Sequence, residues 1–177
     1  MKSSWVVVAV AGFLSLAACE RRDAATPTST PEPTSTPKPT STPEPTFQHR
    51  LSGDISGDYR PTGEEAIQPV ASLFIGQDGA FAAWEAGSRA SAPLILSLTG
   101  PQGEARVLPD AYVVTDDRIQ MRGSALGMGP VELSARIDQG ALATARRNLG
   151  DQTPAVTGTV SVNGRRTPFT LSWWGGD

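Results

Sequence analysis

Apolar and polar residues alternate with a period of two through much of the chain after residue 93, which is the pattern of half-buried β-strands. The clearest case surrounds Asn163-Gly164, a dipeptide typical of a two-residue type I′ hairpin turn. Such a turn pairs Val162 with Arg165, and therefore also Val156 with Leu171, Gly158 with Phe169 and Val160 with Thr167. This register matches apolar with apolar residues, which a shift by one residue would destroy. Pro168 then lies opposite Thr159, where its missing N–H predicts a sheet edge or a bulge.

The same reasoning predicts further strands. A turn at Asp116-Asp117 pairs Val114 with Ile119 and Tyr112 with Met121. Alternation also predicts strands at Leu94–Leu98 and Val131–Ile137. A further hairpin is expected where Leu73–Gly76 and Ala80–Trp84 flank Gln77-Asp78-Gly79, and weaker strands are expected at Arg106–Leu108 and Leu51–Tyr59.

One segment has a helical spacing instead. Asp138 is a candidate N-cap, apolar residues recur at 142, 145 and 149, and Gly150 follows. Arg146 and Arg147 fall in the last turn, where cations interact favourably with the helix dipole. The pattern as a whole predicts a mainly β fold, a small antiparallel barrel or sandwich of about eight to ten short strands with one short helix before the C-terminal hairpin.

The first 46 residues differ from the rest of the chain. Lys2 precedes a ten-residue apolar core, Trp5–Leu14, which is too short for a membrane-spanning helix but typical of an export signal. Residues 28–45 read TSTPEP, TSTPKP, TSTPEP and offer no apolar side chain to bury, so a disordered, extended linker is expected. We therefore divide the chain into a signal peptide (1–18), a linker that begins at Cys19 (19–46) and a single antiparallel β domain (47–177).

The sequence Leu16-Ala17-Ala18-Cys19 resembles the lipobox of bacterial lipoproteins, and Cys19 is the only cysteine. The resemblance implies transfer of diacylglyceryl to Cys19, cleavage between Ala18 and Cys19, and acylation of the new N-terminus, with palmitate an expected acyl group. Three acyl chains would hold the protein on a membrane stably. Glu20 follows Cys19 in place of the Asp that marks inner-membrane retention in enteric bacteria, so the resemblance favours the periplasmic face of the outer membrane.

Composition and charge exclude several classes of protein. The chain has 177 residues, 15 basic and 18 acidic side chains and one cysteine, which argues against a disulfide scaffold, a polytopic membrane protein and a nucleic-acid binder. Residues 47–177 hold eleven arginines, no lysine and fourteen acidic residues. The domain is therefore weakly acidic, with arginine as its only basic residue apart from histidine.

Candidate catalytic chemistry is sparse. His49 is the only histidine, and its place beside the linker suggests a solvated loop residue, so neither a Ser-His-acid triad nor a site for a soft metal is expected. Asp54 and Asp58 in SGDISGDY offer oxygens to calcium, but a calcium site needs six to eight ligands, and a strand with turn or bulge glycines explains the repeat better. We expect no enzyme activity, no metal and no cofactor.

Two sets of residues are candidate binding sites. One is an anion patch for lipid phosphates or a polysaccharide, formed if the helix end lies near the hairpin tip, although ordinary helix-end and turn charges also explain its residues, Arg146, Arg147, Arg165 and Arg166. The other is an apolar pocket inside a barrel, although the same residues would also fill a solid core: Leu94, Leu96, Tyr112, Val114, Met121, Val131 and Leu133.

Val156–Phe169 is also similar to a hairpin of periplasmic isoprenoid-binding, lipocalin-like barrel proteins, and the whole domain resembles uncharacterised lipoproteins of alphaproteobacteria. We expect an envelope lipoprotein whose tethered β domain is a non-catalytic binding module for an envelope protein, a polysaccharide or an apolar ligand. The alternatives are a calycin-like carrier of a small apolar ligand and a carboxylate-dependent cell-wall hydrolase.

Overall fold

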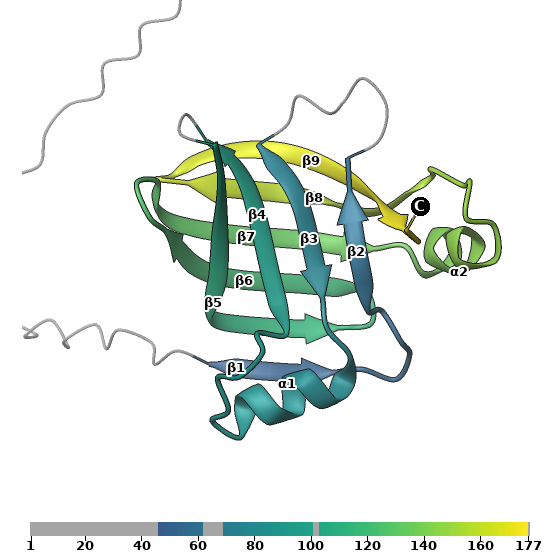
Figure 1. Cartoon of the computed structure of the whole chain (residues 1–177), viewed down its shortest axis with the longest axis horizontal. Coiled ribbons are helices and arrows are strands. Elements are labelled where there is room, and N and C mark those ends of the chain that lie inside the picture. The colour runs from purple at the N-terminus through teal and green to yellow at the C-terminus, as the bar shows by residue number, and fades with distance from the viewer. Residues whose placement is uncertain (1–45, 62–68, 101–102, 177) are drawn as a thin grey trace, which may run out of the picture. The chain divides into compact units, whose positions relative to one another are not determined.

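The computed structural model describes residues 46–61, 69–100 and 103–176, in which eight antiparallel strands close into a barrel (Figure 1). One extra strand and two helices complete the described part. The expected mainly β fold is confirmed, and of the two architectures left open it is the barrel. The expected signal peptide (1–18), Cys19 with its cleavage site, and the linker up to residue 45 lie outside the described residues.

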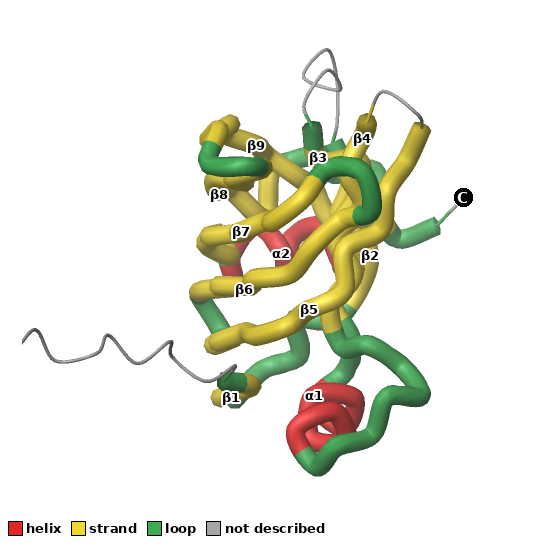
Figure 2. Tube along the Cα trace, turned by 90° about the vertical axis from the view of Figure 1, so that its left-hand side faces the viewer, coloured by secondary structure: helices red, strands yellow, loops and turns green. Residues whose placement is uncertain are grey.

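The barrel strands are neighbours in chain order, each antiparallel to the next (Figure 2). They are β2 (Gly57–Arg60), β3 (Val70–Ile75), β4 (Leu94–Gly100), β5 (Gly103–Thr115), β6 (Arg118–Ala125), β7 (Gly129–Ile137), β8 (Pro154–Val162) and β9 (Arg165–Trp174). Pairing of β9 with β2 closes the ring. The long strand β5 pairs first with β4 and then with β6, and its register shifts between Pro109 and Ala111.

Both predicted hairpin registers are confirmed. In β8 and β9, Val156 lies opposite Leu171, Gly158 opposite Phe169 and Val160 opposite Thr167, and in β5 and β6, Tyr112 lies opposite Met121 and Val114 opposite Ile119. Asn163 and Gly164 both have positive φ, 49° and 80°, as a type I′ turn requires. Pro168 lies opposite Thr159, and no strand among the described residues pairs with the other side of β9 there. Its missing N–H is therefore tolerated at a local edge.

Inward-facing side chains pack into one hydrophobic core. In β6 and β7, buried and exposed residues alternate along the whole described strands, as the sequence pattern predicted. Eight strands enclose a space that is just wide enough for side chains to fill or for one small ligand. The members with no exposed surface include Tyr59, Val70, Leu73, Ile75, Phe81, Leu98, Val107, Val156 and Leu171.

The hairpin expected over Leu73–Trp84 is wrong. Strand β3 ends at Ile75, and Asp78–Glu85 form helix α1. Phe81 and Trp84 are both buried, which their spacing of three allows in a helix, whereas a strand would place them on opposite faces. The alanines between and before them favour a helix because they lose no side-chain entropy.

The extra strand β1 (Phe47–Arg50) lies beside α1 at one end of the barrel and pairs in parallel with β5 (Figures 1 and 2). Aromatic rings join these elements: the ring centroids of Phe47 and Tyr112 lie 5.3 Å apart, and those of Phe81 and Tyr112 lie 5.4 Å apart. The strand expected at Leu51–Tyr59 begins only at Gly57. The preceding loop is held to the β5–β6 turn, because the Asp116 carboxylate accepts hydrogen bonds from Ser52 and Gly53.

The one helix that the sequence predicted is present as α2 (Gln139–Arg147). Asp138 is its N-cap and accepts a hydrogen bond from the Ala141 N–H at 2.9 Å. Leu142 and Ala145 are buried, but the helix ends before Leu149, whose side chain is 68% exposed. The apolar spacing therefore predicted the helix correctly and extended it too far.

Candidate functional site

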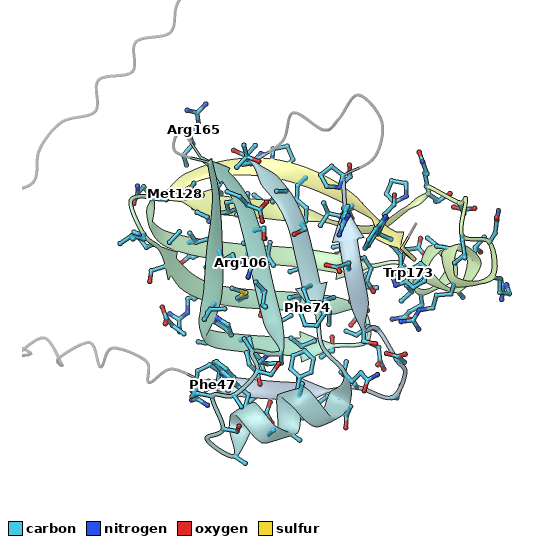
Figure 3. The ribbon with its side chains drawn as sticks, viewed as in Figure 1. Phe47, Phe74, Arg106, Met128, Arg165 and Trp173 are labelled. Atoms are coloured by element: carbon cyan, nitrogen blue, oxygen red, sulfur yellow. The ribbon has the colours of Figure 1, made fainter. Side chains whose placement is uncertain are left out.

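The four arginines of the expected anion patch do not meet. Arg146 and Arg147 end helix α2, which precedes β8, whereas Arg165 and Arg166 follow the turn after β8. The whole strand lies between the two doublets, about 30 Å at about 3.3 Å per residue. Figure 3 places Arg165 at the end of the barrel opposite Trp173 and α2. The expected single patch is therefore wrong.

Arg146 instead supports the fold. Its guanidinium donates hydrogen bonds to the backbone carbonyls of Asp54 (2.6 Å) and Ser56 (2.7 Å) and lies 3.5 Å from the Asp54 carboxylate. Hydrogen bonds from Ser56, assisted by the charge of Arg146, hold the pKa of Asp54 below its usual value. The first half of the SGDISGDY repeat, residues 52–56, thus forms a loop that α2 fixes, and its second half lies in β2. Gly57 begins β2 with a φ of 142°.

The seven residues of the expected apolar pocket all belong to the packed core. Each is at most 3% exposed: Leu94, Leu96, Tyr112, Val114, Met121, Val131 and Leu133. Burial raises the pKa of the Tyr112 phenol, and the nearby negative charge of Glu85 raises it further. Tyr112 therefore stays neutral and contributes an aromatic ring to the core.

His49 is not the solvated loop residue that its position suggested. It lies in β1 with its side chain only 15% exposed, and its ring stacks on Phe81 with centroids 5.4 Å apart. Its Nδ1 lies 2.9 Å from a Glu85 carboxylate oxygen, and its Nε2 lies 3.1 Å from an Asp78 carboxylate oxygen. The imidazole thus joins β1 to both ends of α1. No residue pattern near His49 predicts these contacts, because the partners, Asp78 and Glu85, are 29 and 36 residues away in the sequence.

Outward polar side chains line two adjoining clefts on the outside of the barrel, and of these side chains sequence reasoning had named only Arg166 as a candidate. We name this surface the β5–β9 face. One cleft has a volume of about 700 Å³ and is lined by Thr46, Ala111, Tyr112, Val113, Gln120, Met121, Arg122, Glu132, Leu133, Ser134, Thr159, Ser161 and Arg166. The other, of about 470 Å³, is lined by Arg118, Gln120, Ser134, Ala135, Arg136, Thr157, Gly158 and Thr159. Gln120, Ser134 and Thr159 belong to both.

Strand register orders the β5–β9 face into rows. Arg122 lies opposite Glu132, which lies opposite Ser161, which lies opposite Arg166. Two residues further along the strands, Gln120, Ser134 and Thr159 form the next row. A third row places Arg118 opposite Arg136. The face therefore presents arginines at both ends, with Glu132 opposite Arg122 at one of them, and an amide and hydroxyls between the two ends.

This arrangement suits binding through hydrogen bonds and charge. Glu132 is the one carboxylate among the described residues that line the two clefts, so no carboxylate pair is available there for acid–base catalysis. Among the described residues, no three His, Cys, Asp or Glu side chains converge as a metal site would require. The polar residues that alternate with apolar ones in β6 and β7 could have indicated this surface, but only after the pairing register of the two strands was known.

Comparison with protein-family models, with curated proteins and with solved structures gives no significant match for this chain. Within residues 46–61, 69–100 and 103–176, no helix has the length and apolar character needed to cross a membrane.

Proposed function

We propose that this chain is an envelope lipoprotein whose barrel is a non-catalytic binding module at the end of a tether, with the β5–β9 face as its binding surface. The observation that carries the proposal is the 700 Å³ cleft on that face, whose volume falls within the range of ligand sites and whose lining is rich in hydrogen-bonding groups. The polar residues point outward from well-packed strands, so the surface is rigid.

The membrane anchor in this proposal rests on Leu16-Ala17-Ala18-Cys19. Three acyl chains on Cys19 would hold the mature chain on the periplasmic face of the outer membrane. The segment from Cys19 to Phe47, if extended at about 3.1 Å per residue, would let the barrel reach about 80 Å from its anchor. Such a tether suits a module that searches for a partner near the membrane.

Two experiments test the two halves of this proposal. Labelled palmitate should enter the full chain, whereas a Cys19→Ala variant should take up no label and leave the membrane fraction. Separately, cells in which residues 47–177 are replaced by an inert domain should lose the envelope behaviour that depends on this protein. Normal behaviour of such cells would contradict a binding role for the barrel.

The apolar-carrier alternative is supported less well by the geometry. Eight-stranded barrels can hold one small ligand, but here the seven candidate lining residues are each at most 3% exposed and belong to the core. Native mass spectrometry of the full chain released from detergent separates the two: the binding-module proposal expects the mass of the acylated protein alone. A further stoichiometric adduct that is lost on denaturation would favour the carrier.

A further inference from the structure

Two arginines face each other on the β5–β9 face. Arg118 in β6 lies directly opposite Arg136 in β7, and both side chains are exposed. Hydrogen-bonded and non-hydrogen-bonded positions alternate along an antiparallel ladder, and the Ile137 N–H donates to the Asp117 carbonyl next to this pair. Arg118 and Arg136 therefore occupy a non-hydrogen-bonded position, where the Cα atoms approach to about 4.5 Å and side chains are closest.

Directly opposite like charges destabilise a sheet, and no acidic side chain of the described residues forms an ion pair with either arginine. Within the described part of the chain, neither guanidinium has a hydrogen bond or an ion pair. The adjacent acids are engaged elsewhere: Asp117 accepts from the Thr115 hydroxyl, and Asp138 caps α2. Among the described residues, the repulsion between the two arginines is thus not relieved by a direct ion pair.

The pairing of β6 with β7 also contains a pair of opposite charges with which the two arginines can be compared. Four residues along β6, Arg122 lies opposite Glu132 at the equivalent kind of position, so opposite charges face each other there. Arg118 and Arg136 break this complementarity in a domain whose acidic residues outnumber its arginines. The pair is also flanked by hydroxyls, because the cleft around it includes Ser134, Thr157 and Thr159.

We propose that the Arg118–Arg136 pair is a subsite for a carboxylate of an acidic polysaccharide that lies along the β5–β9 face. Both arginines line the same cleft, and a pair of guanidinium groups matches a carboxylate, which accepts several charge-assisted hydrogen bonds. From this subsite the row of Gln120, Ser134 and Thr159 leads to Arg122, about 13 Å along the strand at about 3.3 Å per residue. An amide and hydroxyls thus lie between the Arg118–Arg136 pair and a row in which Arg122 and Arg166 outnumber Glu132, and this order suits a chain of sugars that bears repeated negative charges.

This inference rests on the proposed function, because it names the ligand of the same surface. Calorimetry on the full chain in a neutral detergent tests it with three probes: a galacturonate hexamer, the same hexamer with its carboxyls methylated, and inorganic phosphate. Arg118→Gln and Arg136→Gln should each weaken binding of the acidic hexamer at least about tenfold, because each removes a charge-assisted contact. The methylated hexamer should bind more weakly to the parent chain and should respond little to either variant. Inorganic phosphate alone should bind negligibly.

A matched control and a second readout keep the test decisive. Arg147→Gln, on the exposed surface of α2, should leave the affinity for the acidic hexamer unchanged. Without ligand and at low salt, Arg118→Gln and Arg136→Gln should raise the melting temperature by about 1–4 °C, because repulsion is removed. This second result also shows that the variants are folded.

The outcomes separate the inference from the proposed function. If both hexamers bind equally and neither arginine variant weakens them, the acidic ligand is wrong and the binding surface stands. If Gln120→Trp, which fills the centre of the face, leaves hexamer binding intact, the surface itself is wrong. If anionic phosphatidylglycerol vesicles bind through Arg118 and Arg136 whereas the acidic hexamer does not, the pair recognises a membrane and the polysaccharide proposal is overturned.

Discussion

Replacement of Gly158 by alanine is the most direct test of the packing beneath the β5–β9 face. A Cβ at this position would lie 2.3 Å from the Ser134 carbonyl oxygen and 2.7 Å from the Ala135 Cα, both in β7. Ordinary contacts lie at 3.4–4 Å, so the backbones of β7 and β8 would have to separate by about 1 Å.

The effect of this separation on the free energy of unfolding has three contributions. Overpacking of this kind costs about 1–3 kcal/mol, and a weakened ladder hydrogen bond adds about 0.5–1.5 kcal/mol. Alanine also lowers the conformational entropy of the unfolded chain, which offsets about 0.4–1 kcal/mol of this cost. We expect Gly158→Ala to lower the free energy of unfolding by about 2–3 kcal/mol, and the melting temperature by about 8–12 °C at about 4 °C per kcal/mol for a domain of this size.

Urea unfolding followed by tryptophan fluorescence measures this change, with Gly79→Ala as the matched control. Gly79 lies in the first turn of α1, and no atom would lie within 4 Å of an added Cβ. That variant should raise stability by up to about 1 kcal/mol, because alanine is the better helix former. A Gly158→Ala variant as stable as the parent chain would refute the register and spacing of β7 and β8 described above.

Three further changes test other parts of the fold. Asp138→Ala removes the N-cap of α2 and should cost about 1 kcal/mol in urea unfolding. Phe81→Ala empties a fully buried position between α1 and the barrel and should cost about 3–5 kcal/mol by the same assay. Asp116→Asn tests a pH dependence: hydrogen bonds from the Ser52 side chain, then from the Ser52 and Gly53 backbone, hold the pKa of Asp116 below its usual 3.8 in the folded state. The ionised carboxylate therefore stabilises the fold above about pH 4, and the stability difference between parent and variant should shrink as the pH falls below that value.

The C-terminal half of the fold was predictable because its signals are local. Asn163-Gly164 fixes the register of β8 and β9. The resulting pairs that match in polarity, such as Val156 with Leu171, all lie within a segment of 16 residues. The Asp116-Asp117 turn does the same for β5 and β6. Asp138 likewise marks the start of α2 through its own side chain.

Helix α1 was missed because two periodicities coexist in it. Gln77-Asp78-Gly79 has the composition of a turn, and Ala80, Ala82 and Trp84 alternate as a strand would. The deciding contacts are those of Phe81 and Trp84 with a core that is assembled from distant strands. A sequence pattern of eight residues does not contain that information.

The candidate sites were predicted wrongly for a different reason: the sequence alone does not show which segments lie at the same end of the barrel. The two arginine doublets are close in sequence, but α2 stands at the start of β8 and the Asn163-Gly164 turn at its end. His49 gained its partners through a parallel pairing of β1 with β5 that spans about 65 residues. The β5–β9 face needed the joint register of four strand pairings, of which only two were predicted.

The measurement that tests the central claim most directly is retention of the full chain on envelope polysaccharide isolated from the cells that produce it. The parent chain and Ala143→Trp, a change on the exposed side of α2, should cosediment with the polysaccharide. Gln120→Trp, which fills the centre of the β5–β9 face, should remain in the supernatant. Equal retention of Gln120→Trp and Ala143→Trp, or no retention of the parent chain, would contradict the account.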